Sequence, residues 1–290
     1  MLRVHAVKSL IVCATSLLLF STAIAQKENK QPTGPLITRT TTRHENYRLP
    51  FGGTVTVVGA PAGSLTIEAW QKSEIDITAS IELQGPNAAA LDQLAVLNTF
   101  AVDVDVDHIR ILTTGTHDRE FMKRVAKNFP KNLIGLPWKL NLQIKLPALT
   151  DLEIDAGVGP INLSGVEGTL RLNALKSDAN LSLTGGLAAV LIQEGSINLN
   201  IPGHSWHGLG AEIRMAAGTV NVGFAPDFSI DVDADVLRAG EIQIGLPNLK
   251  PREGASIAKN SVRARNGNGG ATLSLTLGDG IIRLRQLEKF

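Results

Sequence analysis

The chain has 290 residues, of which 28 are basic and 27 acidic, so its formal net charge of +1 gives no electrostatic reason to bind nucleic acid or an anionic membrane surface. Its apolar residues are mainly aliphatic, glycine occurs 28 times, and Phe, Trp and Tyr together make up only 4%. This composition favours many short strands with tight turns between them over a core built on aromatic side chains.

Residues 1–25 have the three parts of a cleavable secretory signal peptide. Arg3 and Lys8 make the start positive, an apolar stretch extends from Leu10 to Phe20, and Ala23–Ala25 supplies the small residues of a cleavage site. The alternative, a retained membrane anchor, requires roughly 20 apolar residues, and this stretch is shorter. We therefore expect cleavage, no transmembrane segment in the mature chain, and an extracytoplasmic location in the periplasm, on the outer surface or in the medium.

Cleavage also removes the single cysteine, Cys13. The mature chain can then form no disulfide, and its stability must come from packing. It retains 26 basic and 27 acidic residues, a net charge of −1.

Residues 26–45 are polar, contain two prolines and show no periodicity. They are predicted to form a flexible polar tail, and the folded domain is expected over 46–290. From Tyr47 onward apolar and polar residues alternate, which predicts short strands at 54–59, 64–70 and 75–83.

Two stretches interrupt this alternation with helical spacing. Between 86 and 100, apolar residues recur about every third position, and between 116 and 130 Phe121, Val125 and Phe129 lie four apart before Pro130. We expect a short helical insertion in each stretch, with strands at 101–107 and 108–114 between them.

From Leu140 the chain is repetitive. Apolar pairs such as Leu152/Ile154, Leu170/Leu172 and Leu181/Leu183 recur roughly every nine to eleven residues, separated by glycines or small polar residues. The period fits either a β-solenoid, with stacked short strands and an aliphatic interior, or a sandwich, which usually has longer strands and a few large core aromatics. The short strands and scarce aromatics favour an all-β, β-helix-like solenoid with the two helical insertions.

Two segments carry a resemblance to a known family. The layout of strands, prolines and glycines in Asn141–Leu172 and in Asn266–Arg285 resembles the bacterial putative-adhesin family of domains of unknown function. The resemblance covers about 47–285 and implies an exported or envelope-associated β-solenoid. The family has no established catalytic residues, so it implies none here.

Two runs of alternating aspartates are the clearest candidates for a cation site. Three carboxylates at i, i+2 and i+4 of a strand point to one face, where calcium or another hard cation could bind. The alternative is the solvated outer face of a strand whose valines point inward, and neither run has the glycine and glutamate of an EF-hand loop. The residues are Asp103, Asp105, Asp107, Asp231, Asp233 and Asp235.

His204 and His207 flank Trp206 in a predicted loop. They could share a metal ion, while the tryptophan could stack on a sugar, although zinc would need one or two further ligands from distant acids. A polar corner with a half-buried tryptophan explains the same residues.

A basic cluster occupies the second helical stretch. It could contact an anionic polymer or lipid headgroups, or form the solvated face of the helix. The cluster comprises Arg119, Lys123, Arg124, Lys127 and Lys131.

The sequence contains no compact nucleophile motif, zinc-protease motif or phosphate-binding loop. We therefore predict a protein without catalytic residues or a cofactor, whose partner is an envelope protein or a polysaccharide. The alternatives are a polysaccharide-binding or polysaccharide-cleaving β-helix, and a cation-dependent binding module that uses the aspartates.

Overall fold

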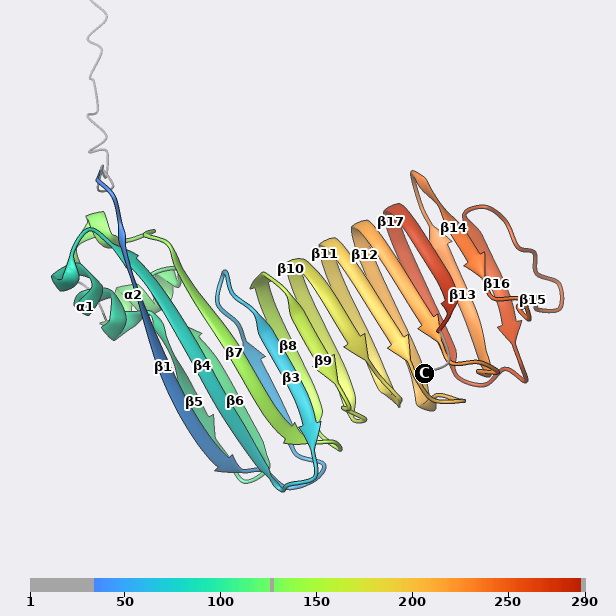
Figure 1. Ribbon diagram of the computed structural model, residues 1–290, viewed down its shortest axis with the longest axis horizontal. Helices are drawn as coiled ribbons and strands as arrows, with labels where there is room; N and C mark the ends of the chain where they lie inside the picture. Colours follow the sequence, from blue (N-terminus) through green and yellow to red (C-terminus); the bar gives the residue numbers. More distant parts are fainter. Residues whose placement is uncertain (1–33, 126–127, 288–290) are drawn as a thin grey trace, which may run out of the picture.

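The computed structural model describes residues 34–125 and 128–287 and is all-β, with one mixed sheet of 17 strands that does not close on itself (Figure 1). The predicted signal peptide lies outside the described residues. Within them, no helix is long and apolar enough to cross a membrane.

The prediction of an all-β chain with two helical insertions is confirmed. The strands are β1 (Ile37–Arg48), β2 (Thr54–Val58), β3 (Leu65–Trp70), β4 (Glu74–Gly85), β5 (Thr99–Val104), β6 (His108–Thr114), β7 (Trp138–Pro147), β8 (Asp151–Val158), β9 (Ile161–Ser164), β10 (Thr169–Ser182), β11 (Gly185–Ile201), β12 (His207–Phe224), β13 (Ile230–Val236), β14 (Gly240–Gly245), β15 (Lys250–Pro251), β16 (Ser261–Asn266) and β17 (Thr272–Gln286). The helices are α1 (Ala88–Leu97), α2 (Arg119–Val125) and the short 3-10 helix η1 (Lys131–Leu133).

The predicted flexible tail is wrong for 37–45. These residues belong to β1, which pairs antiparallel with β4 over its whole length, from Ile37 opposite Gly85 to Arg48 opposite Glu74. The segment has no apolar alternation because both faces of this edge strand are largely solvated, and backbone pairing with β4 does not require buried side chains.

Arg43 of β1 connects this edge strand to β5 at the N-terminal end of the sheet. Its guanidinium donates hydrogen bonds of 2.8 Å to Thr99 Oγ1 and to the carbonyl oxygen of Phe100, and lies 4.3 Å from the centre of the Phe100 ring. The Arg43 side chain thereby covers the buried Phe100 ring and supplies a hydrogen-bond donor to the Phe100 carbonyl oxygen on the edge strand β5.

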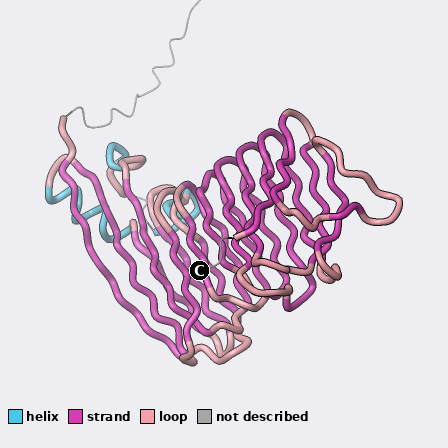
Figure 2. Tube along the Cα trace, turned by 45° about the vertical axis from the view of Figure 1, so that its right-hand side comes forward, coloured by secondary structure: helices cyan, strands magenta, loops and turns pink. Residues whose placement is uncertain are grey.

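The central part is a stack of neighbouring strands (Figure 2). In it β10, β11, β12 and β17 lie parallel and in succession (Figure 1). Leu170 of β10 pairs with Leu152 of β8 and with Ala188 of β11, an offset of 18 residues on each side. The next rung, Ala211, is 23 residues on, because the 202–206 loop lengthens the connection into β12 and a bulge at the start of β12 adds one more residue.

Each long strand turns a corner near its middle. In β11 the buried apolar side chains are Ala188, Val190 and Ile192 before the corner and Ile197, Leu199 and Ile201 after it. The buried positions have even residue numbers before the corner and odd residue numbers after it. This change keeps the apolar side chains of both halves of the strand on the inner side, so both halves contribute to one core cluster. The predicted units of two very short strands therefore appear as continuous strands of 14 to 18 residues, because the residues at the corner also pair with the neighbouring strands.

The helical insertions lie at the N-terminal end of the sheet (Figure 1). Asn87 caps α1 by accepting a 2.9 Å hydrogen bond from the Ala90 amide, and α1 buries Leu91 and Leu94. By contrast, α2 buries none of its residues, and the predicted apolar contact Val125 is 55% exposed.

Candidate binding surface

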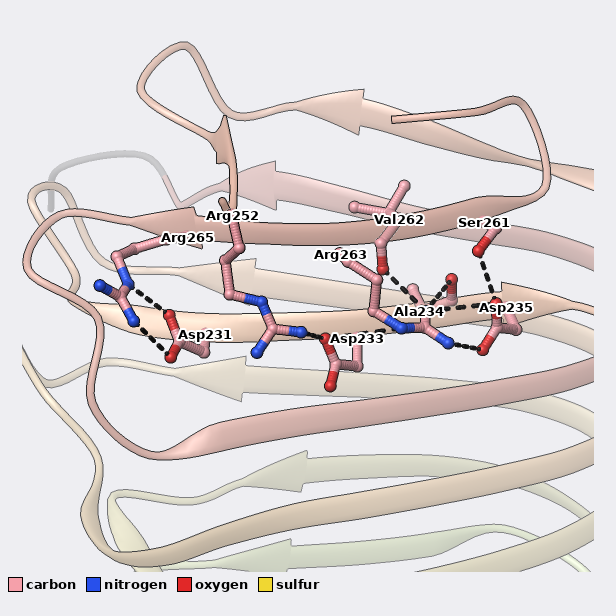
Figure 3. A network of polar contacts seen from close by, with 9 residues as sticks. All are labelled: Asp231, Asp233, Ala234, Asp235, Arg252, Ser261, Val262, Arg263 and Arg265. Atoms are coloured by element: carbon pink, nitrogen blue, oxygen red, sulfur yellow. Dashed lines mark hydrogen bonds and ion pairs between the residues drawn. The ribbon is translucent and has the colours of Figure 1, made fainter. Parts of the chain in front are cut away.

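The second aspartate run lies on the outer face of β13, while Val232 and Val236 point into the core. Its carboxylates face arginines of the β15–β16 region (Figure 3). Arg265 donates to Asp231 through Nε (2.7 Å) and Nη2 (3.0 Å), and Arg252 pairs with Asp233. The cross-strand register brings these opposite charges together, with Asp231 opposite Arg265 on β16.

Asp235 completes this aspartate–arginine ladder. Arg263 Nη2 donates to its Oδ2 at 2.6 Å, and the Ser261 hydroxyl donates to Oδ1 at 2.8 Å. All three carboxylates of the run thus accept hydrogen bonds from arginines, which already supply the positive charge that a cation would bring.

The ladder changes the proton affinity of its carboxylates. The hydrogen bond from Arg265 lowers the pKa of Asp231 below its ordinary value against the opposing effect of burial. For Asp235, burial favours the neutral form, but hydrogen bonds from Arg263 and Ser261 outweigh it and lower the pKa.

The first aspartate run does not form the predicted stripe. Asp103 lies on β5 and pairs with Arg110 at 2.7 Å, whereas Asp105 and Asp107 lie in the turn that joins β5 to β6. The turn ends the strand because the Asp105 amide donates to the His108 carbonyl and its carboxylate accepts from the Val106 amide. Only one of the three carboxylates therefore has strand geometry.

His204 in the loop before β12 and His207 at the first position of β12 are exposed, and Trp206 between them is buried. The Trp206 indole donates a 2.9 Å hydrogen bond to the Gly186 carbonyl, so its ring fills the corner rather than facing a ligand. Within residues 34–125 and 128–287, no group of three or more His, Cys, Asp or Glu side chains is placed to hold a metal ion.

The basic cluster is only partly described, because Lys127 lies outside the described residues. Lys123 pairs with Glu120 one turn earlier at 2.6 Å, and both side chains are largely exposed. Beside them, α1 and α2 leave an open hollow of about 560 Å³ that includes Val96, Val125 and Phe129.

A polar cavity of about 770 Å³ opens at the C-terminal end, next to the aspartate–arginine ladder. Arg252 and Arg265 line it together with Asp227, Lys250 and Glu253. Two of its cations are already neutralised by Asp233 and Asp231. Its lining residues include no histidine, cysteine or aromatic side chain.

The most regular surface lies on β9 and on the second halves of β10, β11 and β12, and we call it the asparagine face. Its outward residues are amides and hydroxyls, apart from Asp178 next to the corner of β10, which accepts a 2.6 Å hydrogen bond from the Ser196 hydroxyl. The amides and hydroxyls are Asn162, Ser164, Asn180, Ser182, Asn198, Asn200 and Asn221.

Four of these asparagines form a ladder across the stack. Asn180 Nδ2 donates to Asn162 Oδ1 (2.9 Å), Asn198 to Asn180 (2.9 Å), and Asn221 to Asn198 (2.8 Å). Each bond joins residues that are paired in register on adjacent parallel strands. The alternation of apolar and polar residues puts Ser182 and Asn198 outside but does not predict the ladder, although the 18-residue spacing of Asn162, Asn180 and Asn198 is visible in the sequence.

The opposite side of the same coils has a different chemistry, and we call it the charged face. It includes the intrastrand pair Arg214–Glu212 and the hydrogen-bonded pair Asn173–Asp155, and Leu191 is 46% exposed. Its outward residues are Glu153, Asp155, Arg171, Asn173, Ala189, Leu191, Glu212 and Arg214. The two sides of the stack therefore suit different partners.

No family model matches the sequence, and no curated protein matches it. The fold is similar to the crystal structure of a putative cell adhesion protein from Clostridium sporogenes, with 12% sequence identity, 85% of this chain and 100% of that chain covered, and a TM-score of 0.46. It is also similar to a putative adhesin from Bacteroides fragilis (14% identity, 89% and 100% covered, TM-score 0.34) and one from Parabacteroides merdae (11%, 89% and 99%, 0.27). These similarities are too distant to indicate what this chain binds.

Proposed function

We propose that this chain is an exported, non-catalytic binding protein of the bacterial cell envelope, and that its stacked coils act as a β-solenoid scaffold of the putative-adhesin kind. The observation that carries the proposal is the register of β8–β12. Equivalent residues of β8/β9, β10 and β11 follow one another at 18-residue intervals, so their outward side chains form rows across the strands, and on the asparagine face one row repeats the same residue as Asn162, Asn180 and Asn198.

A stack of this kind suits an extended partner. Each coil adds one more set of outward side chains at the spacing of adjacent strands, about 4.8 Å, so a long partner can make the same contact repeatedly. Export is supported by the signal-like residues 1–25.

The absence of catalysis is part of the proposal. The carboxylates of Asp231, Asp233 and Asp235 are engaged by arginines, whereas a general acid or base needs a carboxylate free to exchange a proton with substrate. The exposed His204 and His207 flank a tryptophan that is committed to packing.

The test is sedimentation of purified residues 26–290 with washed envelopes of the native host. We expect saturable binding, weakened in the combined variant Arg171→Ala, Asn173→Ala, Ser182→Ala and Asn198→Ala. The variant should remain folded with a modest fall in melting temperature, because exposed substitutions usually cost within about 0.5 kcal/mol and Asn198→Ala in addition removes two ladder hydrogen bonds of about 1 kcal/mol each.

Two results would contradict the proposal. One is a wild-type protein that does not sediment with envelopes. The other is turnover of envelope polysaccharide that Asp231→Asn or His204→Ala abolishes in a folded chain. Mature protein from the host should also begin at Gln26, and an intact Met1 would contradict cleavage.

A further inference from the structure

We propose that the asparagine face binds a neutral, linear glycan that lies along the stack and crosses the strands. The inference rests on the proposed binding function and adds a surface and a ligand class. It starts from the ladder Asn162–Asn180–Asn198–Asn221, which extends over four successive strands.

The ladder leaves hydrogen-bonding capacity pointing outward. A side-chain amide has two N–H donors and a carbonyl oxygen with two lone pairs. Asn180 and Asn198 each use one N–H and one lone pair within the ladder. One donor and one acceptor therefore remain on each of these rungs, in the alternating arrangement that sugar hydroxyls, which both donate and accept, can satisfy.

The spacing matches a polymer rather than a single small molecule. Adjacent strands lie about 4.8 Å apart, close to the length of one pyranose unit in an extended β-linked glycan. Ser164 and Ser182 form a second row on the same face, and no hydrogen bond engages their hydroxyls within the part of the chain that the structure describes. Two parallel rows of fixed polar groups offer repeated contacts on either side of a sugar chain.

Charge selects a neutral ligand. The outward residues of the asparagine face are uncharged except for the carboxylate of Asp178 next to the β10 corner, and further charged residues begin at its borders with Glu68 on β3 and Arg283 on β17. The charged face of the same coils combines carboxylates and guanidiniums with exposed Leu187 and Leu191, a mixture better suited to a protein. An anionic polymer would find no cation between Asn162 and Asn221 on the asparagine face.

The small free energy of each contact also predicts how the binding affinity depends on the length of the glycan. A net hydrogen bond contributes only about 1 kcal/mol, and the face has no aromatic side chain on which a sugar ring could stack. Weak contacts must be summed over several rungs, so short oligosaccharides should bind poorly and longer ones progressively better.

The experiment measures binding of residues 26–290 to insoluble cellulose and chitin, and to soluble cello- and chito-oligosaccharides of increasing length by calorimetry. Polygalacturonate serves as the acidic comparison. We expect binding to at least one neutral series, an affinity that rises with chain length, and no binding to polygalacturonate.

The variants separate the two faces. Asn180→Thr with Asn198→Thr removes the amides and keeps residues that favour strands, and Ser182→Arg places a long side chain over the face without breaking a ladder bond. Both should weaken glycan binding by about tenfold or more, equivalent to about 1.4 kcal/mol. The matched control on β10, Arg171→Thr with Asn173→Thr, should bind glycan like the wild type. Melting curves of every variant exclude unfolding as the cause.

The failures of the two proposals are distinguishable. If the wild type sediments with envelopes but binds neither neutral series, or if the charged-face control loses glycan binding while Ser182→Arg retains it, the glycan inference is wrong and the binding function stands. If the wild type binds neither envelopes nor glycans, both are wrong.

Discussion

Gly195 of β11 and Gly218 of β12 lie opposite each other at the corner of adjacent coils, both with positive φ, 130° and 141°. A Cβ on Gly218 would meet the carbonyl oxygen of Gly195, and Gly280 of β17 repeats the relationship against Gly218. The column of corner glycines is therefore required both by backbone conformation and by the close approach of one strand to the next.

We expect Gly218→Ala to destabilise the protein by about 3 kcal/mol, since it combines an unfavourable φ with a backbone clash. The matched control is Gly270→Ala, whose φ is 136° but whose Cβ would meet nothing within 4 Å. Chemical denaturation of both variants separates the free-energy cost of the unfavourable φ, which both variants incur, from the cost of the backbone clash, which only Gly218→Ala incurs. Equal losses would show that the approach of the coils contributes nothing.

The core prediction concerns Leu163 and Leu183, each 2% exposed. Leu163→Asp or Leu183→Asp buries an unpaired charge and should cost about 3 kcal/mol or more. Leu175→Asp is the control, because Leu175 is 54% exposed on β10 and its substitution should change little. Thermal melts that leave Leu163→Asp unchanged would place this residue outside the core.

Asp231 should contribute pH-dependent stability. Its hydrogen bonds from Arg265 lower its pKa in the folded state below the ordinary 3.8, so the folded state binds the proton less readily than the unfolded state. The stabilisation is fully present above that ordinary value and is lost as the pH falls through the lowered one. The free energy of unfolding of Asp231→Asn should therefore differ from the wild type at pH 7 and converge with it in acid.

A suitable comparison is Asp103→Asn. Asp103 pairs with Arg110, but both side chains are well exposed, so its loss should cost within about 1 kcal/mol at pH 7. A wild-type minus Asp231→Asn difference that stays constant between pH 7 and pH 2 would refute the coupling.

Calcium should not stabilise the protein through β13. Each carboxylate of Asp231, Asp233 and Asp235 already accepts a hydrogen bond from an arginine, and a cation would have to displace these partners. Millimolar Ca²⁺ should leave the melting temperature unchanged at constant ionic strength. A concentration-dependent rise that Asp233→Asn removes would instead indicate a cation site.

The sequence by itself determined the local structure. Alternation predicts strands wherever one face is buried, as in Leu170/Leu172 of β10, and three-to-four spacing predicts α1 because Leu91, Leu94 and Leu97 must share one face. These signals are local, so they do not depend on how the chain returns to itself. The same dependence on burial explains why β1 was missed, since an exposed edge strand carries no alternating pattern.

Only the tertiary structure decided which distant residues meet. Asp231 and Arg265 are 34 residues apart, and their pairing follows from β16 returning antiparallel beside β13. The ladder continues from Asn198 to Asn221 only because the 202–206 loop and a bulge at the start of β12 take up the additional residues, so that the register holds from Leu187 and Gly210 onward. Register between strands is set by backbone pairing and packing over the whole stack, which residue spacing cannot specify once loops differ in length.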